Sequence, residues 1–485
     1  MSRPYDRAVR VAALALVPLL GWDAADAQSS PALRSPAPTP RTTISSLVFA
    51  SPPPATVADG FVYAVLGDIS QVKPVTGLGL PQFDEVLKVV RGTDFVLANQ
   101  EGPAFHTATK KFAVNETGAM FPEDTTAPWD IRNMGVKMVT VANNHGMDYG
   151  ADALFEDLRL LEAAGLAYAG AGANLREARA ATLFATPKGR VTVVATAGTF
   201  KPNFVAADGR GALAERAGIS TVRTTEFQQV TAPEMKALVQ LKAMRAPGSV
   251  TQASADAPPP EQLSVLDQVY RLGDKPGLSF RINEFDLKDI MQAVHTAKQN
   301  SDFTIFTIHA HQSETGEDDT NPRPADYLVQ LFHSVVDAGA DVVAGHGNHL
   351  IRGIEIYRGK PIFYGLASFA FSGQPAGTSV GGEPRLLSEP GPSGPPSDQS
   401  IRRLGNGVTL TMWESIFATT RWKGGQLEEI RVYPIDLTAA GNKPKGVPAF
   451  ASPDVGRKIL NELKRDSEQF GTHVEIEGNV AVIRP

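Results

Sequence analysis

Short apolar runs alternate with amphipathic segments of helix length along most of the chain after residue 60. The runs FVYAVLGD and VKMVTVAN, for example, are followed by the helical patterns PQFDEVLKVVRG and ADALFEDLRLLEAAG. Strands that alternate with helices predict βαβ units and a largely parallel sheet. Runs such as RVTVVATA lack alternation, which is typical of strands covered on both faces. The pattern therefore predicts an α/β fold.

The alternation is interrupted between residues 201 and 280. Two helical patterns, PEMKALVQLKAMR and EQLSVLDQVYRLG, flank a low-complexity loop there, and we interpret this region as a helical insertion. The strand–helix pattern then resumes, and its last part predicts a hairpin that turns at Arg358 and Gly359. A low-complexity loop is expected at 373–400, and alternating strands with one helix are expected in 401–485.

The first 27 residues have the pattern of an export signal. Three arginines precede the apolar run VAALALVPLL, and an A-x-A cleavage motif ends at Ala27. A transmembrane helix needs about 20 apolar residues, so this run is too short to be one. We expect cleavage before Gln28 and export to the periplasm or the medium, with a retained N-terminal anchor as the alternative. Residues 28–57 are rich in Pro and Ser, which predicts a disordered linker.

Composition excludes several classes of site. The 485-residue chain has no cysteine, so disulfides, thiolate zinc sites and iron–sulfur clusters are excluded. Its formal charge is −6, and it contains no basic cluster. Because nucleic-acid affinity depends on phosphate neutralisation by Lys and Arg, we expect no nucleic-acid partner.

Residues of the metal-binding type follow five of the predicted strands. They are Asp68, Asn99, Glu101, Asn144, His145, Asp148, His309, His311, His346 and His349. Each has a structural alternative, such as helix or turn capping for Asp68 and Asp148. Because the carboxyl ends of parallel strands share one edge of a sheet, we expect these side chains to meet in one cleft. Oxygen and imidazole donors without thiolate suit Zn, Mn, Fe or Mg.

The segments that carry these residues include GDIS, ANQEGP, VANNHGMDYG, TIHAHQSE and GADVVAGHGNHLIRG. In this order they resemble the CapA/PgsA family of bacterial capsule and poly-γ-glutamate synthesis proteins, which is related in fold to calcineurin-like metallophosphoesterases. The resemblance covers roughly residues 61–372, within a predicted core of 58–372. It implies a four-layer α/β/β/α fold with a two-metal-type cleft, in which the C-terminal strands and helix complete the second sheet.

The resemblance also implies roles for individual residues. The implied metal ligands are Asp68, Glu101, Asn144, His309, His346 and His349, with His311 and Asn99 as further candidates. His145 is implied to face the substrate, and Asp148 is placed to orient it. The sequence departs from these patterns at three places. It has Ser70 where the first metallophosphoesterase motif has His, and Ala310-His311 where the CapA family has Trp-Gly. It has Gly347-Asn348 where the closing motif has a second His and a Pro. The number of divalent ions, one or two, therefore stays open.

Two functions are compatible with these features. The first is a metal-dependent hydrolase of a phosphoester or an amide bond, in which His145 protonates the leaving group or stabilises the transition state. The second is a non-catalytic component that binds an anionic polymer during capsule synthesis or export. Membrane components of capsule synthesis are the expected protein partners. The sequence does not indicate an oligomeric state.

Overall fold

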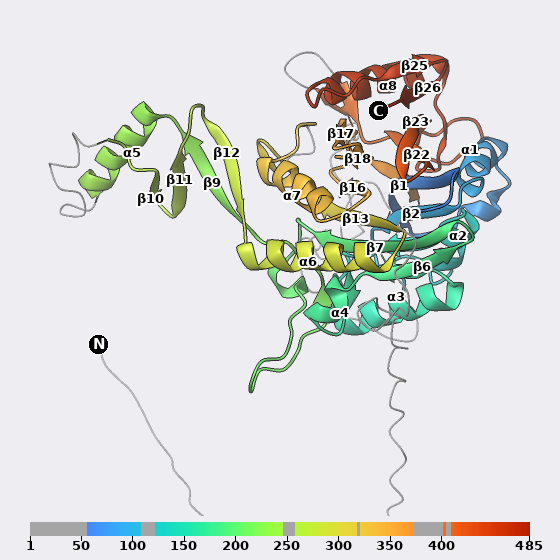
Figure 1. Cartoon of the computed structure of the whole chain (residues 1–485), viewed down its shortest axis with the longest axis horizontal. Coiled ribbons are helices and arrows are strands. Elements are labelled where there is room, and N and C mark those ends of the chain that lie inside the picture. Colours follow the sequence, from blue (N-terminus) through green and yellow to red (C-terminus); the bar gives the residue numbers. More distant parts are fainter. Residues whose placement is uncertain (1–55, 108–121, 246–257, 318–320, 373–400, 404–408) are drawn as a thin grey trace, which may run out of the picture. The chain divides into compact units, whose positions relative to one another are not determined.

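The computed structural model describes residues 56–107, 122–245, 258–317, 321–372, 401–403 and 409–485 (Figure 1). The expected signal peptide at 1–27, nearly all of the linker at 28–57 and the loop at 373–400 lie outside these residues. Within them the chain is mixed α/β, with several sheets and eight α-helices. No helix in this part of the chain combines the length and hydropathy that a bilayer crossing requires.

The larger main sheet has ten strands in the order β25-β26-β23-β22-β1-β2-β3-β4, with β19 paired to β1 and β24 to β23. The pairs β1–β2, β2–β3, β3–β4 and β1–β19 are parallel, whereas β1–β22 is antiparallel. The bounds are β1 Phe61–Gln71, β2 Phe95–Gln100, β3 Met138–Thr140, β4 Ala167–Ala169, β19 Ser368–Ser372, β22 Glu414–Lys423, β23 Gln426–Asp436, β24 Ala449–Phe450, β25 Glu475–Glu477 and β26 Val480–Ile483.

The second main sheet has six strands in the order β17-β18-β16-β13-β7-β6. Its centre, β7–β13–β16–β18, is parallel, and both edge pairs are antiparallel. The edge pair β17–β18 is the expected hairpin, with positive φ at Arg358 and Gly359. The bounds are β6 Thr182–Thr186, β7 Gly189–Ala197, β13 Phe303–Ala310, β16 Val342–Gly347, β17 Ile354–Tyr357 and β18 Lys360–Phe363.

The two main sheets pack against each other through the inner residues of their central strands. Along β13, Phe303 and Ile305 belong to the core shared with β1, whereas Phe306 and Ile308 belong to a second core. The ring of Phe303 lies 5.1 Å from that of Phe61 in β1, measured between centroids. The absence of polar alternation in these strands is thus explained, because both faces are buried.

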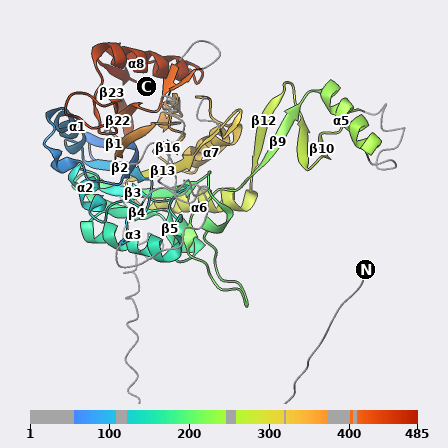
Figure 2. The ribbon, with the colours of Figure 1, turned by 180° about the vertical axis from the view of Figure 1, so that it is seen from behind.

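Helices pack on both main sheets, and one of them, α8, contacts strands of the two sheets (Figures 1 and 2). Helices α6 and α7 pack on the six-stranded sheet, α3 contacts β4, and α8 contacts β23 and β17. The helix bounds are α1 Pro81–Arg91, α2 Ala127–Asn133, α3 Gly150–Ala164, α4 Leu175–Arg179, α5 Ala232–Arg245, α6 Glu284–Asn300, α7 Asp326–Asp337 and α8 Pro453–Glu468; the 3-10 turns are η2 Thr76–Leu78 and η3 Pro202–Phe204.

The described part of the expected helical insertion contains one α-helix and a four-stranded sheet. Helix α5 confirms the first helical pattern, but the second prediction is wrong, because EQLSVLDQVYRLG forms a β-hairpin. A two-residue turn with positive φ at Leu266 and Asp267 closes this hairpin, and pairing of its second strand with β9 overrides the helical pattern. The bounds are β9 Thr224–Val230, β10 Gln262–Val265, β11 Gln268–Leu272 and β12 Gly277–Ile282.

The expectation of one largely parallel sheet needs correction. The motif strands β1, β2 and β3 belong to the ten-stranded sheet, whereas β13 and β16 belong to the six-stranded sheet. The C-terminal strands β22, β23 and β26 extend the sheet of β1. Short pairs complete the described strands: β5 Ala171–Gly172 with β8 Gly218–Ile219, β14 Gln312–Ser313 with β15 Gly316–Glu317, and β20 Ile401–Arg403 with β21 Thr409–Thr411.

Gly67 allows β1 and β19 to approach each other closely just before the motif residue Asp68. A Cβ atom at Gly67 would lie 1.9 Å from the carbonyl oxygen of Ala367. The register of β1 against β2 also shifts between Val65 and Asp68. Only glycine fits this close backbone approach without displacing β19.

Two buried carboxyl groups lie behind the end of β2. Asp157 of α3 accepts hydrogen bonds from the Ala104 amide and Gln100 Nε2, both at 3.0 Å. Glu123 accepts hydrogen bonds from the backbone N–H of Gln71 at 2.8 Å and from Gln100 Nε2 at 3.2 Å. Burial raises the pKa of Asp157 to about 7 and the pKa of Glu123 well above its usual range. Burial thus favours the protonated form of both groups in the folded protein.

We expect Gly67→Ala to lower the free energy of unfolding by about 1–3 kcal/mol, because the added methyl group overpacks the β1–β19 contact. Gly77→Ala is the control, since a Cβ there meets no atom within 4 Å. Urea denaturation of both variants measures the difference. Equal stability of Gly67→Ala and wild type would contradict the close approach.

We expect Asp157→Asn to stabilise the protein at pH 8 but not at pH 4. The pKa of Asp157 is higher in the folded than in the unfolded chain, so the wild type loses stability as the pH rises from about 4 to about 7. Removing this charge should recover up to about 4 kcal/mol at pH 8. Asp152→Asn, at an exposed position of the same helix, is the control. Parallel pH profiles for wild type and Asp157→Asn would contradict the raised pKa.

Candidate metal centre

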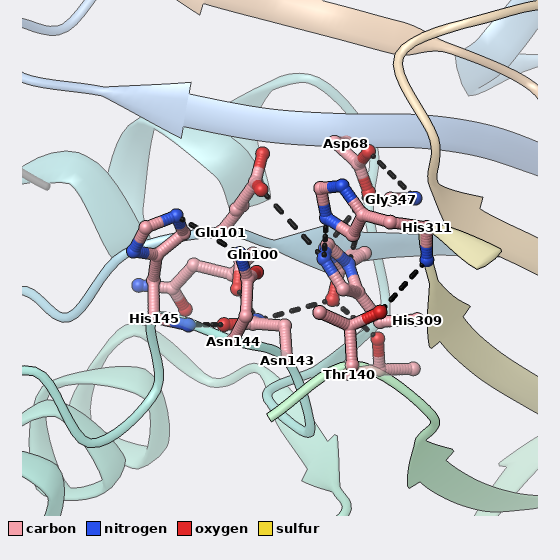
Figure 3. Close-up of polar contacts among 12 residues, drawn as sticks. Asp68, Gln100, Glu101, Thr140, Asn143, Asn144, His145, His309, His311 and Gly347 are labelled. Atoms are coloured by element: carbon pink, nitrogen blue, oxygen red, sulfur yellow. Dashed lines mark hydrogen bonds and ion pairs between the residues drawn. The ribbon is translucent and has the colours of Figure 1, made fainter. Parts of the chain in front are cut away.

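The candidate ligands meet where strands of both main sheets end (Figure 3). Asp68 lies in β1, Glu101 follows β2, and Asn144 and His145 follow β3. His309 in β13 and His346 in β16 are register partners in the other sheet. The expected convergence therefore arises from two packed sheets whose strand ends face one another, and not from one sheet.

Two groups of ligand atoms share Glu101. In the first, Glu101, His309 and His311 present one atom each, all within 4.8 Å of one another. In the second, Asp68, Glu101 and His349 do the same. His309 Nε2 lies 3.7 Å from Glu101 Oε1 and 3.2 Å from His311 Nε2. A carboxylate shared by two groups is compatible with one ion or with two neighbouring ions.

The side-chain amide of Asn99 holds this cluster in place and is therefore not a free ligand. Its Nδ2 lies 2.8 Å from Asp68 Oδ1 and 3.1 Å from His309 Nδ1. Its Oδ1 accepts hydrogen bonds from Thr140 Oγ1 at 2.9 Å and from Asn143 Nδ2 at 3.2 Å. Asn99 is fully buried, so these bonds fix the orientation of Asp68.

His309 is held in the neutral form that a metal ligand requires. Its side chain is 1% exposed, and burial together with His311, His346, His349 and His145 lowers its pKa well below the usual range. A neutral imidazole keeps one ring nitrogen available for a metal ion. His309 therefore needs to lose no proton at neutral pH before it could coordinate an ion.

His346 contacts protein oxygens with both ring nitrogens, and its role as a ligand stays a prediction. Its Nε2 lies 3.0 Å from the Leu66 carbonyl oxygen, and its Nδ1 lies 3.1 Å from Thr307 Oγ1. Burial lowers the pKa of His346, so the ring is neutral, with one nitrogen donating and the other accepting. Because both nitrogens are engaged, His346 joins β16 to β1 beneath the ligand cluster.

The loop after β16 shapes the cluster through its backbone. The Gly347 amide donates to Asp68 Oδ2 at 3.1 Å. A Cβ atom at Gly347 would lie 2.8 Å from His309 Nε2, and the φ of 101° also favours glycine. His349 has a φ of 49°, uncommon for a residue other than glycine, and strained backbone of this kind clusters at functional sites.

His145 has the hydrogen-bond partner expected of an oriented acid or base. Its Nδ1 lies 2.7 Å from Oδ2 of the buried Asp148. The N-cap position of α3 is Tyr149, whose side chain makes no cap hydrogen bond. Lys201 Nζ donates to the second Asp148 oxygen at 2.9 Å. The same carboxylate thus contacts an imidazole and an ammonium group.

Several contributors were not among the sequence-based candidates. Asn143 is buried and organises Asn99, but it precedes the Asn144-His145 pair, and sequence alone does not separate the two asparagines. Lys201 lies beyond β7 and carries no motif signal. The buried Oδ1 of Asn144 has no hydrogen-bond partner among the described residues, so this oxygen is available to coordinate a metal ion. The donors therefore fit a divalent ion held by oxygen and imidazole groups.

Comparison with known proteins supports a family assignment. Residues 67–373 match the family described as bacterial capsule synthesis protein PGA_cap. The uncharacterized protein y4sH of Sinorhizobium fredii is 32% identical over 443 residues, which cover 88% of this chain and 94% of that protein. A capsule biosynthesis protein, CapA, of Bacillus anthracis is 24% identical over 289 residues, 60% of this chain and 53% of that protein.

Two further likenesses concern a mycobacterial protein and a solved structure. A probable polyglutamine synthesis accessory protein of Mycobacterium tuberculosis is 28% identical over 291 residues, 58% of this chain and 57% of that protein. A hypothetical protein of Thermus thermophilus with a solved structure covers 78% of this chain and 99% of its own, at 12% identity and a TM-score of 0.36, too low to support an argument. With most of its described core inside the matched region, this chain belongs to the PGA_cap family of bacterial capsule synthesis proteins, together with CapA.

Proposed function

We propose that this protein is a metal-dependent hydrolase of capsule or poly-γ-glutamate type polymer metabolism, with the four-layer α/β/β/α arrangement of metallophosphoesterases. The observation that carries the proposal is the buried cluster of Asp68, Glu101 and His309 beside His145, which contacts a buried carboxylate. Burying so many polar groups at one point is costly for a fold unless they are used.

Six residues would hold one or two divalent ions, of which Mn, Zn, Fe and Mg fit the donors: Asp68, Glu101, Asn144, His309, His311 and His349. A divalent ion, when bound, lowers the pKa of a water molecule and polarises the bond under attack. Glu101 occupies the position common to both ligand groups, so its loss should affect every bound ion. Asn99 would orient the ligand Asp68 through a hydrogen bond, and His346 would hold the neighbouring backbone at Leu66 in place.

His145 would donate a proton to the leaving group. Its Nδ1 is held by Asp148, which leaves Nε2, now 3.3 Å from Asn144 Nδ2, as the nitrogen on the ligand side. Lys201 balances the charge of Asp148 and fixes that carboxylate. His145 and Asp148 are thus the proposed catalytic and orienting residues, respectively.

The substrate proposal draws on the relatives. Relatives are named for capsule biosynthesis and polyglutamine synthesis, which favours a polymer with amide bonds. The metallophosphoesterase-like arrangement of ligands favours a phosphoester. We therefore propose hydrolysis of one of these two bond types, with membrane components of capsule synthesis as partners.

A second candidate function is non-catalytic. One relative carries the name of an accessory protein, which favours a component that binds an anionic polymer through a cation without cleaving it. Bound metal without turnover of either bond type would favour this function.

We expect His145→Ala to retain the bound metal and to lose about 10²- to 10⁴-fold in turnover, because it removes a proton donor and no ligand. Glu101→Gln should lose both metal and turnover. Metal content after dialysis and hydrolysis of an aryl phosphodiester and a γ-glutamyl oligopeptide are the measurements. Glu85→Gln, at an exposed position, is the control and should match wild type.

The outcomes separate the role assignments. If His145→Ala loses metal as completely as Glu101→Gln, His145 is a ligand and its assignment is wrong. If wild type and His145→Ala both bind metal but neither cleaves either substrate, the binding function replaces the hydrolase.

We also propose that the protein is exported after cleavage before Gln28, since residues 1–27 have the pattern of a signal peptide. The intact mass of protein recovered from periplasm or medium should correspond to a chain that begins near Gln28. A full-length chain recovered with membranes would contradict cleavage.

A further inference from the structure

A polar cavity lies where the insertion joins the rest of the chain, and no candidate metal ligand lines it. Its volume is about 240 Å³, and its walls come from α4, from the segment around Ala207, and from the chain on either side of the insertion. Arg179 lies at its buried end, and Arg216 and Arg223 are exposed. Three guanidinium groups thus surround one small cavity, together with the carboxylates of Asp208 and Asp286.

Arg179 is a buried cation with unused hydrogen-bonding capacity. Its side chain is 7% exposed, and its Nη2 donates to the Thr221 carbonyl oxygen at 2.5 Å. Its Nη1 lies 3.4 Å from Asp289 Oδ2, a long contact to a carboxylate that is 59% exposed. Arg179 Nε has no hydrogen-bond partner among the described residues. An unpaired donor at this depth is costly unless a ligand satisfies it.

The nearest buried carboxylate is already used by another arginine. Asp286 Oδ2 accepts from the backbone amide and Nε of Arg223 at 2.9 and 2.7 Å, and Oδ1 accepts from Arg223 Nη2 at 2.8 Å. Arg179 Nη2 lies 3.7 Å from Asp286 Oδ1, beyond hydrogen-bonding distance. Burial lowers the pKa of Arg179, because loss of water disfavours its charged form. An added anion would stabilise that charge.

We propose that this cavity binds a small oxyanion, a carboxylate or phosphate group, with Arg179 as the buried anchor. A guanidinium presents its N–H groups in a planar fork that matches the two oxygens of either group. The cavity is smaller than the roughly 300–1,000 Å³ usual for drug-sized ligands, which restricts the ligand to a compact anion. Arg216 lies at the wall and adds positive charge.

The test is isothermal titration calorimetry on the full-length chain, treated with a chelator so that the metal centre holds no ion. Inorganic phosphate and L-glutamate are titrated separately, and the tighter of the two identifies the oxyanion. We expect saturable one-site binding, weakened about ten-fold or more by Arg179→Met, because a hydrogen bond to a charged group is lost. Arg210→Met, which changes an exposed arginine outside the cavity, should bind as wild type does.

A second variant separates loss of the site from loss of the fold. Ala207→Leu keeps every charge but places a larger side chain at the cavity wall, and it should weaken binding to a similar extent. Equal affinity of wild type and both variants would overturn the proposal. Absence of saturable binding of both anions to wild type would overturn it as well.

Discussion

The candidate metal centre depends on buried hydrogen bonds that join the ends of two separate sheets. Asn99, in the ten-stranded sheet, contacts His309 of the six-stranded sheet, while the Gly347 amide reaches back to Asp68. His346 adds a third link through the Leu66 carbonyl oxygen. Each partner is almost completely buried, so breaking any of these bonds leaves a polar group without water. The relative position of the sheets and the orientation of the ligands are thereby fixed together.

This arrangement separates residues that hold the cluster from residues that would serve as ligands. Asn99 and His346 use their polar atoms within the protein, whereas Glu101, His309 and His311 present atoms close to one another. His145 lies at the side of this cluster, and its contact with Asp148 orients it. A bound ion and a proton donor would thus be positioned by different residues, the ion by the cluster at Glu101 and the donor by Asp148.

The sequence predicted the elements of the fold better than their assembly. Apolar runs such as β7 and β13 are recognisable because burial on both faces removes polar alternation, yet that pattern does not say which sheet a strand joins. Motif position predicted that His309 and Glu101 lie together, and their atoms do lie close to each other. It did not indicate that the ring nitrogens of His346 contact the partner sheet and a neighbouring strand. Lys201 was missed because its contact with Asp148 arises only from tertiary structure. The hairpin β10–β11 was missed because pairing with β9 decided its conformation.

The central claim is that the strand ends of both sheets hold a divalent ion at Glu101. Anomalous diffraction from crystals of the full chain grown with Mn²⁺ tests it most directly. The account predicts a manganese peak about 2.0–2.2 Å from Glu101 and His309 donor atoms, with Asp68 or His311 completing the set. A fully occupied manganese ion elsewhere in the molecule, with no peak at Glu101, would contradict the account.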